Sequence, residues 1–295
     1  MHPEQTTTQA GALSPLILAC LAATWFLWGS TYLAIKFALV SFPPFFQMGT
    51  RFLVGGTFLL LWVWWRRQKM PTLTQWRNAS IVGALMLAGN VGGVAYAEQS
   101  VASGLVVAFI AIVPALITIA SLPFGIRPSR LEAVGICIGI VGVLLLVRGD
   151  AFTASLAGLI ALTIAALGWS IGAVLSQHVF PLASSFAGFA SAMICGGAVL
   201  LVLSLLTGET FHWRPQPLAA AAWMYLVVCS LIAFSAYMVL LANTRPALAS
   251  SNSFVNPVIG MFLGVSLGGE RITTHEWIAV GIIVLGVTVL ILGRR

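Results

Sequence analysis

Aromatic and polar side chains interrupt several long apolar segments of this sequence. In the segment WFLWGSTYLAIKFAL, residues 25–39, helical spacing places Trp25, Trp28, Gly29, Tyr32 and Lys36 on one face. Large rings beside a glycine suit two arrangements. The glycine can let a neighbouring helix approach closely, or the rings can wall a cavity for a flat apolar ligand. The residues leave both arrangements open for Trp28 and favour packing for Trp25.

Two side-chain amides lie one helical turn apart in another apolar segment. Asn252 and Asn256 share a face, and Ser253 lies beside the first. An amide without a hydrogen bond in hydrocarbon is costly, so these groups bind either a ligand or a neighbouring helix. We expect a site for a small molecule with a flat apolar part and a charged end. Its expected binding residues are Trp28, Ser30, Tyr32, Trp169, Asn252 and Asn256.

Proline and residues near helix ends suggest moving parts. Pro114 and Pro257 each remove a backbone donor inside an apolar segment, which predicts paired kinks or hinges. Five other side chains are expected to act as gates or interface anchors because they lie toward the ends of their helices. These are Tyr96, Gln99, Gln177, His178 and Tyr237.

Motifs for phosphate, metal or covalent chemistry are missing from the sequence. It has no GxxxxGK[ST] loop, no HExxH or CxxC motif and no paired Asp/Glu cluster. We therefore expect neither an ATP-driven pump nor an enzyme, and no cofactor or metal. Proton coupling stays open and would need Glu98, His178 or an indirect route. A membrane enzyme acting on lipid or isoprenoid groups is the main alternative, and a channel or structural subunit is a third.

Composition places all of these residues in a membrane protein. Hydrophobic residues make up 60% of the 295 residues and charged residues only 7%, far below the share in soluble domains. Apolar runs long enough to cross a bilayer recur along the whole chain. The net charge of +7 is explained by basic loops that set orientation, so no nucleic-acid partner is expected. No obligate protein partner is evident.

The pattern predicts an all-α protein with ten transmembrane helices. The expected ranges are 14–36, 45–65, 79–98, 103–122, 131–148, 155–178, 183–206, 218–241, 247–267 and 275–292. Lys and Arg are concentrated in the even-numbered connections and the C-terminal tail. This bias predicts that both termini, residues 1–13 and 293–295, lie in the cytoplasm.

The two halves of the sequence repeat each other. Trp28 matches Trp169 at an offset of 141 residues, Pro114 matches Pro257 at 143, and Glu132 matches Glu276 at 144. Each repeat, 14–148 and 155–292, contains five helices. Because five is odd, the second repeat must insert in the opposite direction, which predicts inverted repeats around a central cavity.

These residues resemble the ten-helix, EamA-type members of the drug/metabolite transporter superfamily. The resemblance lies in WGSTYLAIK (28–36), PPFFQMGTRFLVGG (43–56), GICIGIVGVLLL (135–146) and NPVIGMFLGVSLGGERITTHEWIAVGIIVLGV (256–287). It covers nearly the whole chain and extends to the YddG-type bacterial exporters of aromatic amino acids. One departure is that Ile126 stands where the repeat would place the counterpart of Glu270.

The resemblance implies a multi-pass secondary transporter of the bacterial inner membrane that works by alternating access. Its implied cargo is an aromatic or other hydrophobic amino acid, or a related small amphipathic metabolite or drug, moved outward. Phosphorylated cargo is not expected, because it would demand several buried Lys or Arg. A superfamily carrier for a different small metabolite is the alternative within this resemblance.

Overall fold

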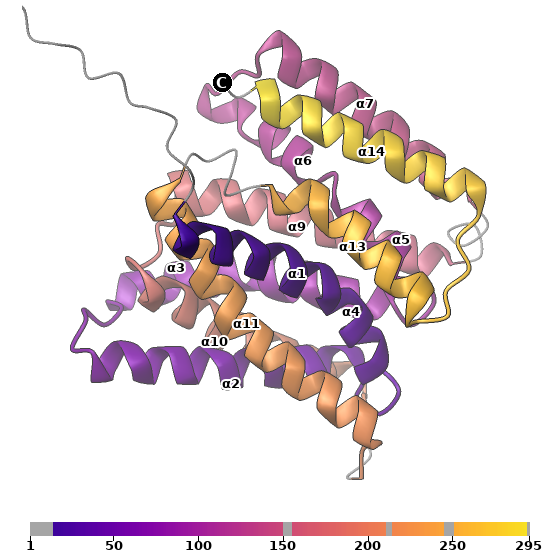
Figure 1. Cartoon of the computed structure of the whole chain (residues 1–295). Helices are drawn as coiled ribbons and strands as arrows, with labels where there is room; N and C mark the ends of the chain where they lie inside the picture. Colours follow the sequence, from indigo (N-terminus) through magenta and orange to yellow (C-terminus); the bar gives the residue numbers. More distant parts are fainter. Residues whose placement is uncertain (1–13, 150–154, 211–213, 245–250, 294–295) are drawn as a thin grey trace, which may run out of the picture.

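The computed structural model describes residues 14–149, 155–210, 214–244 and 251–293, and these residues are all in helices and short connections (Figure 1). The first half contains α1 (Pro15–Ala38), α2 (Pro44–Trp65), α3 (Leu73–Gly83), η1 (Ala84–Gly92), α4 (Gly93–Ala97), α5 (Ser103–Ile110), α6 (Val113–Ala120), η2 (Leu122–Phe124) and α7 (Arg130–Val147). The second half contains α9 (Leu156–His178), α10 (Phe186–Leu206), α11 (Pro217–Asn243), α13 (Asn252–Ser266) and α14 (Thr274–Gly293).

These elements form ten apolar spans. Among the described residues, eight helices are long and apolar enough to cross a membrane, counting 73–97 and 103–124 as one span each. Two shorter apolar helices, Val255–Ser266 and Thr274–Leu290, supply the ninth and tenth. The predicted ten-helix fold is confirmed. The predicted start of the third helix at residue 79 is late, because its first turn is polar, and the first part of the predicted ninth helix, 245–250, lies outside the described residues.

Helix starts follow local capping signals. The Thr72 and Ser129 side chains accept hydrogen bonds from the backbone N–H groups of Gln75 and Glu132, and each partner side chain binds back in a capping box. Glu276 accepts hydrogen bonds from the Thr273 N–H and hydroxyl at 2.8 and 2.9 Å. Carboxylates at these N-termini also oppose the positive end of the helix dipole. Glu132 and Glu276 thus fix helix ends and lie outside the cavity lining.

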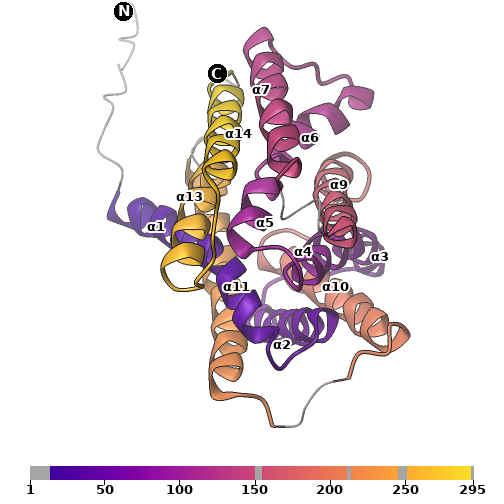
Figure 2. The same ribbon diagram turned by 90° about the vertical axis from the view of Figure 1, so that its right-hand side faces the viewer.

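The two halves pack as inverted repeats. A glycine Cβ at Gly135 would meet Leu290, whereas one at Gly142 would meet Ile283, so residue numbers rise along α7 as they fall along α14. The same reversal relates α2 to α10. Both pairs join a helix to its own repeat counterpart, and antiparallel counterparts define an inverted repeat. Figures 1 and 2 show α7 and α14 side by side at one edge of the molecule.

Two groups of helices enclose the centre of the molecule. The first group, α1, α11 and α13, packs through α1. The second group, η1, α4, α6 and α9, packs through α9. The two groups correspond to each other under the repeat. Figure 2 shows α1, α11 and α13 on one side of α5, with α4 and α9 on the other. This arrangement leaves the facing sides of α1, α9 and α13 to line any central space.

Two spans are irregular beside that centre. The third span contains a nine-residue π-helix, η1, between α3 and α4. The fourth span breaks after Ile110 and resumes at Val113, with Pro114 in the first turn of α6. A proline is tolerated there because the first turn has no intrahelical acceptor for its missing N–H. Pro257, by contrast, lies inside the continuous helix α13. The two prolines therefore act differently on their helices.

Candidate binding cavity

A cavity lies between the two helix groups and draws its walls from both repeats. It has an empty volume of about 920 Å³, which includes its open mouth. Apolar side chains form most of the lining, and a few polar groups converge on it, as is usual for small-molecule sites. The polar and aromatic lining residues are Trp28, Thr31, Tyr32, Arg51, Phe52, Asn90, Trp169, Phe234, Asn252, Ser253 and Asn256.

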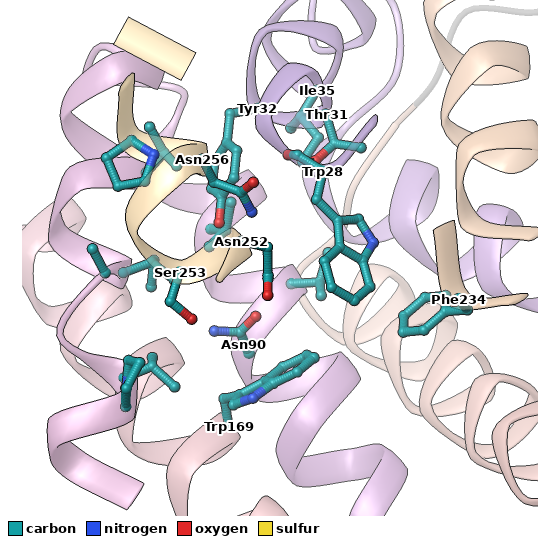
Figure 3. A pocket seen from close by; sticks show the side chains of 18 of the residues that line it. Trp28, Thr31, Tyr32, Ile35, Asn90, Trp169, Phe234, Asn252, Ser253 and Asn256 are labelled. Carbon is teal, nitrogen blue, oxygen red and sulfur yellow. The ribbon is translucent and has the colours of Figure 1, made fainter. Parts of the chain in front are cut away.

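Indole rings form facing walls of the cavity. Figure 3 shows Trp28 from α1 and Trp169 from α9 on different sides of the opening, with amide side chains between them. Trp28 is supported from behind by Phe234 at 5.5 Å and Tyr237 at 5.2 Å between ring centroids. Trp25 does not line the cavity, and its Nε1 donates to the Ser251 hydroxyl at 2.8 Å. The structure thus gives the two tryptophans of α1 different environments.

The amides of α13 have different local roles. With its amide turned so that the nitrogen donates, Asn256 contacts the carbonyl oxygens of Asn252 at 3.2 Å and Trp25 at 3.1 Å. It therefore joins α13 to α1 while lining the cavity. Asn252 and Ser253 have no side-chain hydrogen bond among the described residues and point into the space (Figure 3). Their polar atoms are available to a ligand.

Asn90 and Arg51 line the cavity without having been expected there. Asn90 lies on η1 and donates to the Ala165 carbonyl at 3.0 Å. Arg51 is only 4% exposed, its Nε donates to the Ser230 hydroxyl at 2.7 Å, and its guanidinium lies 5.2 Å from the Phe52 ring centroid. It forms no ion pair with a described carboxylate. In the sequence, Arg51 stands in the family-like segment 43–56 as a cation inside an apolar helix, which fits an outward-reaching side chain equally well.

Apart from the two prolines, the remaining expected residues lie outside the cavity lining. The Ser30 hydroxyl lies 2.6 Å from that of Tyr225, so it packs between α1 and α11. Tyr96 stacks on Phe45, and Gln99 donates to the Tyr96 carbonyl at 3.2 Å. His178 stacks on Phe124 at 4.6 Å. Gln177 is near the same end of α9. Pro114 and Pro257 do line the cavity.

A buried carboxylate joins three elements beside one end of the cavity, next to Ile35 of its lining. The Glu270 side chain accepts hydrogen bonds from Lys36 Nζ at 2.7 Å, the Ser103 N–H and hydroxyl at 2.8 Å each, and the Gly104 N–H at 3.0 Å. It thereby ties α1 and the α13–α14 connection to the first turn of α5. We call this the Lys36 end. Burial alone would raise the pKa of Glu270, but Lys36 and these amide and hydroxyl donors hold it below its usual value.

Comparison with known proteins agrees with this architecture. The chain matches the EamA-like transporter family over residues 13–148 and 156–292. It is 38% identical over 280 residues to the uncharacterized inner membrane transporter YedA of Escherichia coli (strain K12), covering 94% of this chain and 91% of YedA. It is 24% identical to the uncharacterized transporter YoaV of Bacillus subtilis (strain 168), covering 84% and 87%.

A solved crystal structure has the same fold. At 21% sequence identity it superposes with a TM-score of 0.66 and covers 96% of this chain and 100% of its own. The family match extends over both repeats and nearly all of the described helices. Together with the YedA similarity, this match shows that the chain belongs to the EamA-like transporter family.

Proposed function

We propose that the chain is a secondary carrier of the inner membrane that exports aromatic or other hydrophobic amino acids. The observation that carries this proposal is the lining of the cavity, which combines two indole walls with one buried guanidinium. Flat apolar side chains stack favourably on indoles.

The charge of the lining favours a carboxylate ligand. Arg51 is buried, and the described residues that line the cavity include no Asp or Glu. A buried cation without a charged partner is costly, and a substrate carboxylate would relieve that cost with a charge-assisted hydrogen bond. The oxygens of Asn252 and Ser253 can accept from an ammonium group. A lone Arg is too little for a phosphorylated cargo and disfavours purely cationic drugs.

The helix packing supports alternating access between the repeats. At the Lys36 end, α5 packs against α1 and α13, both in the first helix group, so the fourth span begins on that group. Further along the same span, α6 packs mainly on α9. We propose that transport separates α5 from α1 and α13 and closes the other end. With both termini in the cytoplasm, as the distribution of Lys and Arg indicates, the Lys36 end faces outward.

Counterflow in proteoliposomes tests the proposal. The purified protein is loaded with one amino acid, and uptake of radiolabelled amino acids is measured across a panel that includes aromatic, aliphatic and decarboxylated analogues. We expect saturable counterflow for aromatic amino acids and little for amines that lack the carboxylate. Equal counterflow of the amines, or none for any amino acid, would contradict the proposal.

Two variants of Arg51 sharpen the test. We expect Arg51→Gln to lower the affinity for carboxylate substrates by about 10- to 100-fold, because a hydrogen bond to a charged group contributes about 1.5–3 kcal/mol. Arg51→Lys keeps the positive charge and should lose less of the affinity for carboxylate substrates. The matched control is Arg66→Gln, since Arg66 lies at the end of α2 over the Trp62 ring and outside the cavity. If Arg51→Gln bound the same substrates as tightly as the control, the carboxylate assignment would be wrong.

A further inference from the structure

A second carboxyl group lies near the ion pair at the Lys36 end. Glu98 follows the last residue of α4, and its backbone N–H donates to the Val94 carbonyl at 3.0 Å. Its side chain interacts electrostatically with Glu270 and Lys36, and also with Tyr32, which lines the cavity. Glu98 therefore lies near both a residue of the cavity lining and the contacts at the Lys36 end.

The surroundings of Glu98 do not suit an ionised carboxylate. The residue is 5% exposed, and neither side-chain oxygen has a hydrogen-bond partner among the described residues. Taking a carboxylate out of water without hydrogen bonds is costly. The C-terminal end of a helix also carries partial negative charge, which adds to that cost. A neutral, protonated carboxyl group avoids both penalties.

The neighbouring charges also leave Glu98 uncompensated. The charged and titratable side chains around it are Lys36 and Tyr32 from α1, Arg51 from α2, Glu270 from the α13–α14 connection and Tyr96 from α4 itself. The neighbouring η1 and the described part of α9 near α4 carry no titratable side chain. Lys36 already forms its ion pair with Glu270, at 2.7 Å. Two carboxyl groups thus share one ammonium group. Burial first, and then the Glu270 charge, raise the pKa of Glu98 well above its usual value, against a smaller effect of Lys36.

We propose that Glu98 is a proton-binding site that is occupied while the Lys36 end is closed and empties when that end opens to water. This rests on the proposed carrier function. The linkage has a definite sign. The closed state binds the proton more tightly than the open state, so acid favours closure and a rise in pH favours opening. Proton occupancy then sets how readily the Lys36 end opens.

Infrared spectroscopy detects the proton without any substrate. A protonated carboxyl group has a carbonyl stretch that an ionised carboxylate lacks. At neutral pH we expect such a band in the wild-type protein and its loss in Glu98→Gln. The matched control is Glu209→Gln, because the Glu209 carboxylate, unlike that of Glu98, accepts hydrogen bonds from the Phe45 and Phe46 N–H groups. A spectrum in which Glu98→Gln keeps the whole band would overturn the proposal.

Thiol labelling tests the link to opening. Ile35→Cys reports on the cavity beside Lys36, in a protein whose four native cysteines are replaced, and a membrane-impermeant maleimide is added from the Lys36 side. Rates are divided by those of Val40→Cys, which is 59% exposed near the same end of α1. We expect the ratio to rise about tenfold per pH unit below the pKa, because the ionised fraction does so. Glu98→Gln should hold the ratio low and independent of pH, and Glu209→Gln should behave like the wild type.

The outcomes separate this site from the carrier function. Counterflow with a pH-independent labelling ratio in the wild type would refute the proton site and leave the carrier proposal intact. A band assigned to Glu98 and a pH-dependent ratio, without counterflow of any amino acid, would support the proton site and refute the substrate class.

Discussion

The cavity lining combines residues that solve different problems for one ligand. Trp28 and Trp169 offer flat apolar surface, while Arg51 offers a charge that the described protein leaves without a carboxylate partner. Stacking on an indole ring stabilises a bound aromatic ring beyond the effect of burial, and the guanidinium can bind a carboxylate through two hydrogen bonds. Under the proposed function, the indoles and the guanidinium together favour molecules that carry an aromatic ring and a carboxylate, as aromatic amino acids do.

Trp28 can be tested apart from the charge. We expect Trp28→Ala to raise the half-saturation concentration for aromatic substrates about tenfold, because an aromatic pair contributes about 0.5–1.5 kcal/mol beyond burial. The half-saturation concentration for aliphatic amino acids should rise less. Counterflow kinetics provide the measurement. Trp64→Ala is the matched control, since Trp64 is 67% exposed and lies outside the cavity. An equal loss for aromatic and aliphatic substrates would speak against stacking.

At this scale the sequence indicates some of the site and misses the rest. The sequence predicts four residues of the cavity lining, Asn252, Asn256, Trp28 and Trp169. The amides were predicted because they need a hydrogen-bond partner inside an apolar segment, and the indoles because large rings at mid-membrane can form the wall of a cavity. Ser30 met the same criterion, yet it faces Tyr225. Which side of a helix faces a cavity depends on its rotation against its neighbours, and a single sequence does not contain that rotation.

Helix pairs form the next scale, and glycine controls how closely they pack. A Cβ at Gly286 would clash with the Gly139 backbone nitrogen, so α14 and α7 touch through their backbones. Gly281, on the same helix, has no atom within 4 Å of the corresponding position. The same Gly→Ala substitution can therefore be made at a tightly packed position, Gly286, and at an open one, Gly281.

We expect Gly286→Ala to destabilise the protein by about 1–3 kcal/mol, since inserting a methyl group into a full contact forces helices apart. Gly281→Ala should be neutral or stabilising, because alanine is favoured over glycine by about 0.8–1.0 kcal/mol in a helix interior. Thermal unfolding in detergent measures both variants. Equal midpoints for the two would show that α7 and α14 are not in backbone contact.

The lengths and number of helices were predictable because hydrophobic runs record them directly. The irregular third and fourth spans were not predictable in detail. The sequence of residues 84–92, ALMLAGNVG, contains no signal that predicts a π-helix. This segment packs against α9 and α10, and that packing is not visible in the sequence. Pro114 did predict an interruption of the fourth span, and in the structure this proline lies in the first turn of α6.

For the whole molecule, the central question is whether the two helix groups must move apart. Val107 on α5 and Gly260 on α13 face each other, with 3.4 Å between the Val107 Cβ and a Cβ built on Gly260. That separation is close to the range that a disulfide spans. A bond at this position would fix α5 against α13 at this contact.

We therefore expect the Val107→Cys/Gly260→Cys protein, in a background without its native cysteines, to lose counterflow on oxidation and regain it on reduction. Each single-cysteine variant, treated in the same way, is the control for damage by the oxidant. Full counterflow of the oxidised, cross-linked double variant would mean that transport does not require α5 and α13 to separate.

The Lys36–Glu270 contact has a counterpart by sequence offset that lacks its charges. Gln177 stands 141 residues after Lys36, and Ile126 stands 144 residues before Glu270. A carrier held by an ion pair at one face and by neutral groups at the other spends unequal times exposed to the two compartments. Its half-saturation concentrations for influx and efflux should then differ, and high salt should narrow that difference, although the final distribution of cargo stays fixed by the gradients alone.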